Sequence, residues 1–370
     1  MDKTISQTVS DRYARAAASG EQRCCPTGYT FDDLRSFIPE EVLRISYGCG
    51  TPAGLQIVTL GQTVLDIGSG GGIDCFEAAR LVGPTGRVIG IDMTDTMIEI
   101  ARQYTPAVMA NLGYAVSNVE FRKGMAEAMP VEDSSIDLII SNCVINLAPD
   151  KQKVFREMYR VLKPGGRFTI SDIVSDQPVP NYLVHDTQKW GNCLSGALQA
   201  SAYITGIVEA GFVGIHQVKC VPWQIVDGIH FRSITLTGYK LSPAVDDPKP
   251  LFATLRGPFS SVTDEFGQTS QRGVPISVIP YTARLLATLP FEKLFVVSNT
   301  PVMLELSDPR LTKILPKENH ASGKGTMLYS PARSLNPRMM TTIFSDVAFL
   351  SRSVRRLGKS SIRTPTAPIL

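Results

Sequence analysis

The sequence predicts an α/β fold built on an open, mostly parallel sheet, and three observations point to this class. Short β-branched apolar runs alternate with helical patterns from Val64 to Lys240. The first run, Val64 to Ile67, ends in a glycine-rich turn before a helical segment, as in nucleotide-binding βαβ units. The next run ends in Asp92, about 20 residues after the glycines, where such folds hold a ribose diol.

The individual elements follow from apolar periodicity and from turn residues. Thr94 is the expected N-cap of the second helix, and Lys163-Pro164-Gly165-Gly166-Arg167 is the expected turn before the fifth strand. An irregular insertion after that strand, through residue 198, is the expected substrate cap. The expected strands are 64–67, 88–92, 119–121, 136–141, 168–172, 212–219 and 233–240, and the expected helices are 73–80, 94–112, 150–162 and 202–210, with a further helix within residues 1–23.

Length and composition describe an ordinary globular protein of two domains. The chain has 370 residues, of which 43% are hydrophobic and 19% are charged. Positive charge is concentrated in residues 301–370, with eleven basic and four acidic residues, but no aromatic-interleaved basic motif predicts nucleic-acid binding. The expected segments are an N-terminal cap over 1–60 with the Cys24/Cys25 and Cys49 loops, a main domain over 61–240, a linker over 241–250, a small α+β domain over 251–300 and a basic Ser/Thr/Pro-rich, partly disordered tail over 301–370.

No 18-residue apolar span and no secretory signal are visible in the sequence, so we expect a cytoplasmic monomer without a membrane partner. The seven cysteines are an odd number spread through a large chain, which argues against a secreted disulfide framework. Cys75 and Cys220 are interpreted as packing residues. The four histidines show no metal-binding spacing, so none is assigned as a ligand; His185, beside the cap, is the one histidine for which a functional role is left open.

The segment Asp66-Ile67-Gly68-Ser69-Gly70, with an acid before the first glycine, resembles the first motif of class I S-adenosylmethionine methyltransferases. A Rossmann dehydrogenase is the competing interpretation, but no second dinucleotide-binding half follows. The resemblance implies a Rossmann-like, seven-stranded sheet whose last strand is antiparallel, with S-adenosylmethionine as the cofactor.

Three cysteines stand at positions that favour chemistry over packing. Cys49 is flanked by glycines in a loop directly before the first strand, where nothing screens its sulfur. Cys143 follows the fourth strand at the sheet edge where open α/β sheets bind ligands. Cys193 lies in the insertion and can reach over the pocket, and the adjacent Cys24 and Cys25 precede a proline in an accessible loop.

The motifs Ser46-Tyr47-Gly48-Cys49-Gly50, Ser141-Asn142-Cys143-Val144-Ile145-Asn146-Leu147 and Cys193-Leu194-Ser195-Gly196-Ala197-Leu198 together resemble the arsenite S-adenosylmethionine methyltransferases over roughly residues 10–240. The resemblance implies methylation of arsenite to mono- and dimethylated species, arsenic detoxification, and a thiol reductant such as glutathione or the thioredoxin system. Domain 61–240 would then carry an arsenic-binding cap. The implied arsenic ligands are Cys49, Cys143 and Cys193, with Cys24 and Cys25 as further catalytic candidates, and the implied cofactor-binding residues are Tyr47, Asp66, Gly68, Gly70, Asp92, Met93, Met125, Ala126, Glu127 and Asn142.

Soft thiolates are suitable ligands for the arsenic substrate that the resemblance implies. Trivalent arsenic is thiophilic, and its remaining lone pair can attack the sulfonium methyl without a general base. We expect Cys143 and Cys193 to be the pair nearest the methyl donor, with Cys49 capturing inorganic arsenite or pairing with Cys24 or Cys25. Two alternatives remain: a C-methyltransferase acting on a sterol, quinone or phosphobase, and a non-enzymatic thiol module that sequesters a metalloid.

Overall fold

A computed structural model describes residues 5–19, 34–45, 48–50, 57–184, 194–241, 250–257, 260–263, 269–287 and 291–304. The predictions at Cys24, Cys25, Tyr47, His185 and Cys193 lie outside these residues, as do most of the linker and the tail beyond residue 304. The chain divides into two compact units, the first made chiefly of residues 1–248 and the second containing the strands between 251 and 298.

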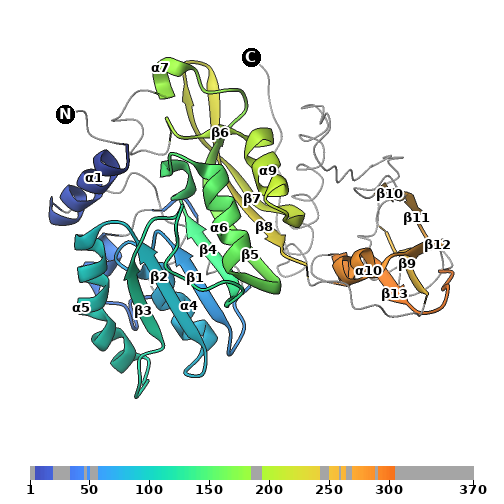
Figure 1. Cartoon of the computed structure of the whole chain (residues 1–370), viewed down its shortest axis with the longest axis horizontal. Coiled ribbons are helices and arrows are strands. Elements are labelled where there is room, and N and C mark those ends of the chain that lie inside the picture. Colours follow the sequence, from blue (N-terminus) through green and yellow to red (C-terminus); the bar gives the residue numbers. More distant parts are fainter. Residues whose placement is uncertain are drawn as a thin grey trace, which may run out of the picture. The chain divides into compact units, whose positions relative to one another are not determined.

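The first unit is built on one sheet in the order β3-β2-β1-β4-β5-β8-β7, with a two-residue strand, β6, paired to β5 (Figure 1). β8 runs antiparallel to both of its neighbours, and the strands from β3 to β5 are parallel. This is the predicted seven-stranded sheet with an antiparallel last strand. The strands are β1 (Thr63–Ile67), β2 (Arg87–Asp92), β3 (Val119–Lys123), β4 (Ile136–Asn142), β5 (Leu162–Ser175), β6 (Leu198–Gln199), β7 (Val213–Val226) and β8 (Ile229–Tyr239).

The strand register brings the predicted site residues to one edge of the sheet. Leu65 in β1 lies opposite Ile89 in β2 and Ile139 in β4, and all three are buried. Such apolar runs, covered on both faces, are typical of central parallel strands. The carboxyl ends of β1, β2 and β4 therefore meet at the same edge, where Gly68, Asp92 and Asn142 follow.

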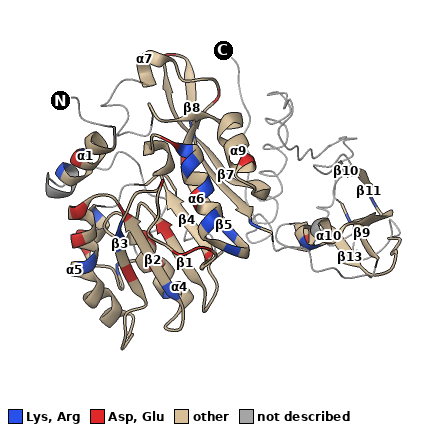
Figure 2. Ribbon diagram, in the orientation of Figure 1, with Lys and Arg blue, Asp and Glu red and all other residues tan. Residues whose placement is uncertain are grey.

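The helices bury apolar faces against this sheet and each other. In α6, Val154, Phe155, Met158 and Val161 are buried, whereas Lys and Arg residues mark the same helix in Figure 2, so α6 is amphipathic. No helix in the described part of the chain is both long and apolar enough to span a membrane. The helices of this region are α1 (Ile5–Ser19), α3 (Glu40–Arg44), α4 (Ile73–Val82), α5 (Asp95–Asn111), η2 (Ile145–Leu147), α6 (Lys151–Val161), α7 (Asn181–Val184) and α9 (Ala200–Glu209).

Thr94 occupies the predicted N-cap position of α5, although its side chain makes no capping hydrogen bond and its N–H donates to the Asp92 carboxylate. Two local predictions need correction. The expected turn at 163–167 is part of β5, where the pairing with β4 shifts register and Gly165 takes a φ of +85°. β7 continues to Val226 because an edge strand tolerates Pro222 at an irregularity, so Cys220 lies within the strand and not at its end.

The second unit contains a three-stranded antiparallel sheet, β12-β9-β13, and a separate β10-β11 pair. Leu304 is buried, and its N–H donates to the Gly273 carbonyl. Packed structure therefore continues past residue 300. The elements of this unit are β9 (Leu251–Leu255), β10 (Ser261–Thr263), β11 (Thr269–Gln271), β12 (Pro275–Val278), η3 (Phe291–Lys293) and β13 (Phe295–Ser298). Helix α10 (Pro280–Leu286) is grouped with the first unit through residue 285.

Candidate active site

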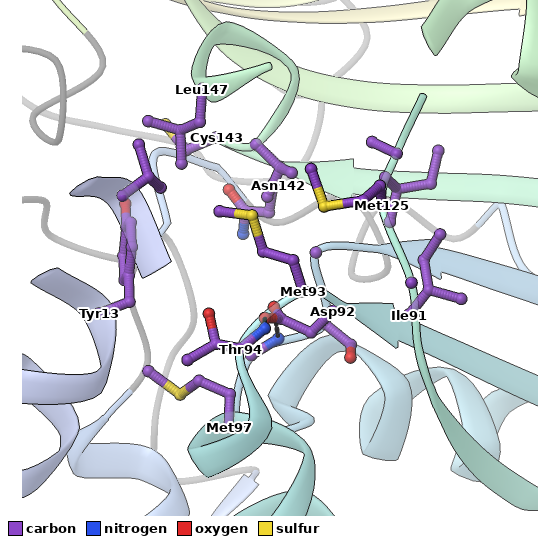
Figure 3. Close-up of a pocket in the computed structure, with 18 of the residues that line it drawn as sticks. Tyr13, Ile91, Asp92, Met93, Thr94, Met97, Met125, Asn142, Cys143 and Leu147 are labelled. Atoms are coloured by element: carbon purple, nitrogen blue, oxygen red, sulfur yellow. Dashed lines mark hydrogen bonds between the residues drawn. The ribbon is translucent and has the colours of Figure 1, made fainter. Parts of the chain in front are cut away.

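A cavity opens at the carboxyl edge of the sheet in the first unit. Its open volume, which includes the solvent at its mouth, is about 980 Å³. In Figure 3, Asp92 and Thr94 lie toward one end and Cys143 and Leu147 toward the other, with Met93 between them. The cavity can therefore hold one elongated ligand that reaches from an acid to a thiol.

The glycine loop between β1 and α4 leaves room for a ligand. Gly68 and Gly70 have φ values of +73° and +50°, which favour glycine. A side chain at Gly70 would meet no atom within 4 Å, so the space beside this backbone is empty. Ser69 Oγ is buried without a hydrogen-bond partner among the described residues, although Ser69 lines the cavity. An unsatisfied hydroxyl beside a bare backbone fits a polar ligand held close to the loop.

Asp92, at the end of β2, is held by the backbone on both sides. Its Oδ2 accepts from Gly70 N at 3.0 Å and its Oδ1 accepts from Thr94 N at 2.8 Å. Burial raises the pKa of Asp92, although these N–H donors oppose the shift. Asp92 also lines the cavity, where its carboxylate can accept from a hydroxyl of a ligand. The orientation suits a pair of adjacent ribose hydroxyls.

The charge of the cavity wall is acidic. Asp74, Asp92 and Glu127 line it, and the described lining residues include no Lys, Arg or His. Such a wall attracts a cation and disfavours a phosphate. A sulfonium ligand with an ammonium group matches this charge.

Asp66, a predicted cofactor-binding residue, is not among the residues that line the cavity. It is buried, and its Oδ2 accepts from Cys75 Sγ at 3.3 Å. Burial and then the charge of Asp74 raise the pKa of Asp66 well above its usual range. Asp66 is thus linked to α4 through Cys75, which is buried in that helix as predicted.

Cys49 and Cys143 are joined by a disulfide at the far end of the cavity, with Cα atoms 5.7 Å apart. Cys143 lines the cavity, and both residues are buried. The expected pairing of Cys49 with Cys24 or Cys25 is thus not the one in this structure. The described residues contain no group of three or more His, Cys, Asp or Glu side chains that could hold a metal ion.

The side chain of Asn142 connects this thiol end to the glycine-loop helix. Its Oδ1 accepts from Cys49 N and Gly50 N, both at 3.0 Å. Its Nδ2 donates to the Gly50 carbonyl at 2.9 Å and to Asp74 Oδ2 at 3.1 Å. Asn142 also lines the cavity, so one residue touches the cofactor space and holds the Cys49 loop.

Comparisons with known proteins give this geometry a family. Residues 59–217 match a family described as a methyltransferase domain, and residues 253–325 match a domain of unknown function (DUF8838). The arsenite methyltransferase of Halobacterium salinarum is 44% identical over 198 residues, which cover 54% of this chain and 48% of that protein. The mouse arsenite methyltransferase is 42% identical over 222 residues, covering 59% of this chain and 56% of the relative.

A solved structure decides the assignment. The crystal structure of CrArsM, an arsenic(III) S-adenosylmethionine methyltransferase from Chlamydomonas reinhardtii, aligns with a TM-score of 0.56 and 32% identity, covering 72% of this chain and 96% of that one. The chain belongs to the arsenite methyltransferase family. The predicted class I methyltransferase fold is confirmed, and S-adenosylmethionine is the cofactor. The chain spans about half the length of the curated relatives it matches.

The structure brings most of the predicted site residues of this arsenite methyltransferase family member to one cavity. Sequence reasoning missed Ser69 and Thr94, which adjoin predicted residues, and Tyr13 of α1, for which the sequence offered no signal. The predicted residues that line the cavity are Gly68, Gly70, Asp92, Met93, Met125, Ala126, Glu127, Asn142 and Cys143.

Proposed function

We propose that this chain methylates trivalent arsenic, from arsenite to mono- and dimethylated species, with S-adenosylmethionine as methyl donor. The observation that carries the proposal is the Cys49–Cys143 pair at one end of a cavity whose other end has the acid and glycine loop of a nucleoside site. A detoxification role follows from the same chemistry. It is part of the proposal.

The chain's own residues account for binding of the cofactor. Asp92 accepts hydrogen bonds from the ribose hydroxyls, and the Gly68 to Gly71 backbone allows close approach of the methionine end. Met125, Ala126 and Glu127 form the wall for the adenine, by the resemblance of their segment to the family. When bound, S-adenosylmethionine supplies an electrophilic methyl group on a sulfonium sulfur.

The thiols hold the arsenic substrate once the disulfide has been reduced. Two molecules of a thiol such as glutathione supply two electrons and two protons to Cys49 and Cys143 and leave as one disulfide. Both sulfurs then displace hydroxyl groups of arsenite, which leave as water with the thiol protons, and Cys193 is the proposed third ligand.

The arsenic lone pair would form the As–C bond as the methyl–sulfonium bond breaks, so no general base is needed because that lone pair carries no proton. Arsenic loses two electrons in this step, and two further molecules of the thiol return them, leaving as a disulfide, before a second methylation. Orienting the two reactants supplies the catalysis, with about 7–11 kcal/mol available from such positioning.

The structure disfavours the alternatives. A phosphobase substrate would bring a phosphate to a wall that has carboxylates and no cation among its described residues. A sterol or quinone methyltransferase has no use for a pair of thiols at this place. A module that only sequestered metalloid would not need the Asp92 and glycine-loop arrangement.

Time-resolved speciation of arsenic products tests the proposal. The full chain would be incubated with arsenite, S-adenosylmethionine and glutathione, and the products separated by chromatography with element-specific detection. We expect monomethylated and then dimethylated arsenic, dependent on both the methyl donor and the thiol. Binding of S-adenosylmethionine without any methylated arsenic product would refute the proposed substrate.

A further inference from the structure

The main chain of Cys49 and Gly50 is held by side chains of the sheet. Both N–H groups donate to Asn142 Oδ1, and the Gly50 carbonyl accepts from Asn142 Nδ2. The Cys49 carbonyl accepts from Ser233 Oγ at 2.8 Å. Every backbone polar group of these two residues is therefore bonded to one of two side chains. This arrangement fixes the position of the peptide that carries the Cys49 thiol.

The glycines beside Cys49 let its peptide lie flat against the sheet. A Cβ on Gly48 would come within 2.5 Å of Asn142 Nδ2. A Cβ on Gly50 would overlap the Ser171 hydroxyl, which itself bonds Thr235 Oγ1 at 2.9 Å. Any side chain at either position would lift the loop from its two hydrogen-bonding partners.

Ser233 has no other visible role. It lies in β8 opposite Ile173 of β5, is 2% exposed, and is not part of the cavity wall. A buried hydroxyl needs a hydrogen-bond partner, and the partner of Ser233 is the Cys49 carbonyl, 184 positions earlier in the chain. Its neighbours along the strand, Thr235 and Thr237, bond hydroxyls of β5 instead.

We infer that Ser233 is a positioning residue that, with Asn142, keeps the Cys49 thiol beside Cys143 when the disulfide is open. The reduced pair is then ready to chelate arsenic without first ordering the loop. The contribution of this thiol positioning to arsenic methylation rests on the proposed function. The positioning itself does not, because it can be measured from the thiols alone.

The experiment is the equilibrium between the Cys49–Cys143 disulfide and the dithiol in glutathione buffers. In that exchange one glutathione disulfide is reduced to two glutathione molecules as the two cysteines are oxidised, so atoms and electrons balance. Differential alkylation of the full chain, followed by mass spectrometry of the peptides that carry Cys49 and Cys143, gives the equilibrium constant.

Ser233→Ala should lower the equilibrium constant for oxidation of the two cysteines to the disulfide about two- to tenfold. This change is the equivalent of one net hydrogen bond that orders the loop in the reduced state. The matched control is Thr237→Val, which removes a buried hydroxyl from the same strand that bonds Thr169 and not the loop, and it should leave the constant unchanged. Gly50→Ala, which keeps both hydrogen-bonding side chains but lifts the loop, should shift the constant in the same direction as Ser233→Ala. Affinity for S-adenosylmethionine, measured by calorimetry, should be the same in Ser233→Ala and the wild type.

An unchanged constant in Ser233→Ala overturns the inference. So does an equal shift in Thr237→Val, or a parallel loss of S-adenosylmethionine affinity, because either would show general loosening of the sheet edge. If the chain forms no methylated arsenic yet Ser233→Ala shifts the constant as expected, the positioning stands and the proposed function fails. If the chain methylates arsenic but the constant is unshifted in Ser233→Ala, the proposed function stands and the positioning inference fails.

Discussion

Asp92→Ala is the sharpest test of how the cofactor is bound. The wild-type carboxylate is oriented by Gly70 and Thr94 and lines the cavity. A hydrogen bond to a charged group contributes about 1.5–3 kcal/mol. Loss of two such bonds to ribose hydroxyls removes at least about 3 kcal/mol, and since 1.4 kcal/mol is a factor of ten, Kd should rise by about 150-fold or more.

Isothermal titration calorimetry with S-adenosylmethionine measures this change directly. Asp95→Ala is the matched control, since Asp95 is three positions along the chain and pairs with exposed Lys123 at 2.7 Å, away from the cavity wall. Asp95→Ala should bind as the wild type does. A folded Asp92→Ala variant whose Kd stays within about threefold of the wild type would refute the assignment of Asp92 to the ribose.

The same carboxylate gives a pH dependence with a definite sign. Burial raises the pKa of Asp92, and protonation removes the negative charge that strengthens its hydrogen bonds. Affinity for S-adenosylmethionine should therefore fall as the pH is lowered through the raised pKa. The fall should begin at a higher pH than an ordinary aspartate would give, and Asp92→Ala should lack it.

Three further predictions concern the thiols, the sheet core and the second unit. Cys143→Ser should lose methylation of both inorganic and monomethylated trivalent arsenic. Cys49→Ser should lose only methylation of inorganic arsenite, because Cys49 is not part of the cavity wall. Product speciation on the two substrates measures this, and equal effects of the two variants would contradict the prediction. Burial raises the pKa of Asp172 to about 7, so the folded chain binds more protons than the unfolded chain between about pH 4 and 7, and the free energy of unfolding should fall by up to roughly 4 kcal/mol as pH rises through that window. Urea unfolding of Asp172→Asn should lack this slope. Leu304→Ala should destabilise the second unit by about 2–5 kcal/mol in thermal unfolding without changing S-adenosylmethionine affinity, and a coupled loss of affinity would argue against separate units.

The strands and the cofactor end of the site were predictable because their signals are local. A β-branched run before glycines and a second run before an acid require only neighbouring residues, and both gave the observed β1 and β2. The extent of β5 and β7 was not predictable in this way. Gly165 and Pro222 usually end a strand, but β5 continues across a register shift in its pairing with β4, and β7 continues across irregularities in its pairing with β8.

The thiol end of the site depends on contacts that no local pattern encodes. Cys49 and Cys143 are 94 positions apart, and the segment before β1 must fold back over the sheet edge to join them. The resemblance assigned Asn142 to the cofactor, but its hydrogen bonds to Cys49 and Gly50 come from that fold-back. Ser233, in an ordinary strand pattern, gave no sequence signal at all.

The backbone at Cys143 adds an argument for a functional thiol that is independent of the family. Cys143 has a φ of +61°, in the left-handed region that glycine and asparagine adopt most readily. This conformation turns the chain directly after β4, and the turn is anchored by the Cys143 N–H, which donates to the Ser171 carbonyl at 2.8 Å. A glycine there would relieve the strain, at a saving of about 1–2 kcal/mol. Since a cysteine stands at this position, lines the cavity and meets Cys49, the strain supports selection for the sulfur and not for the turn alone.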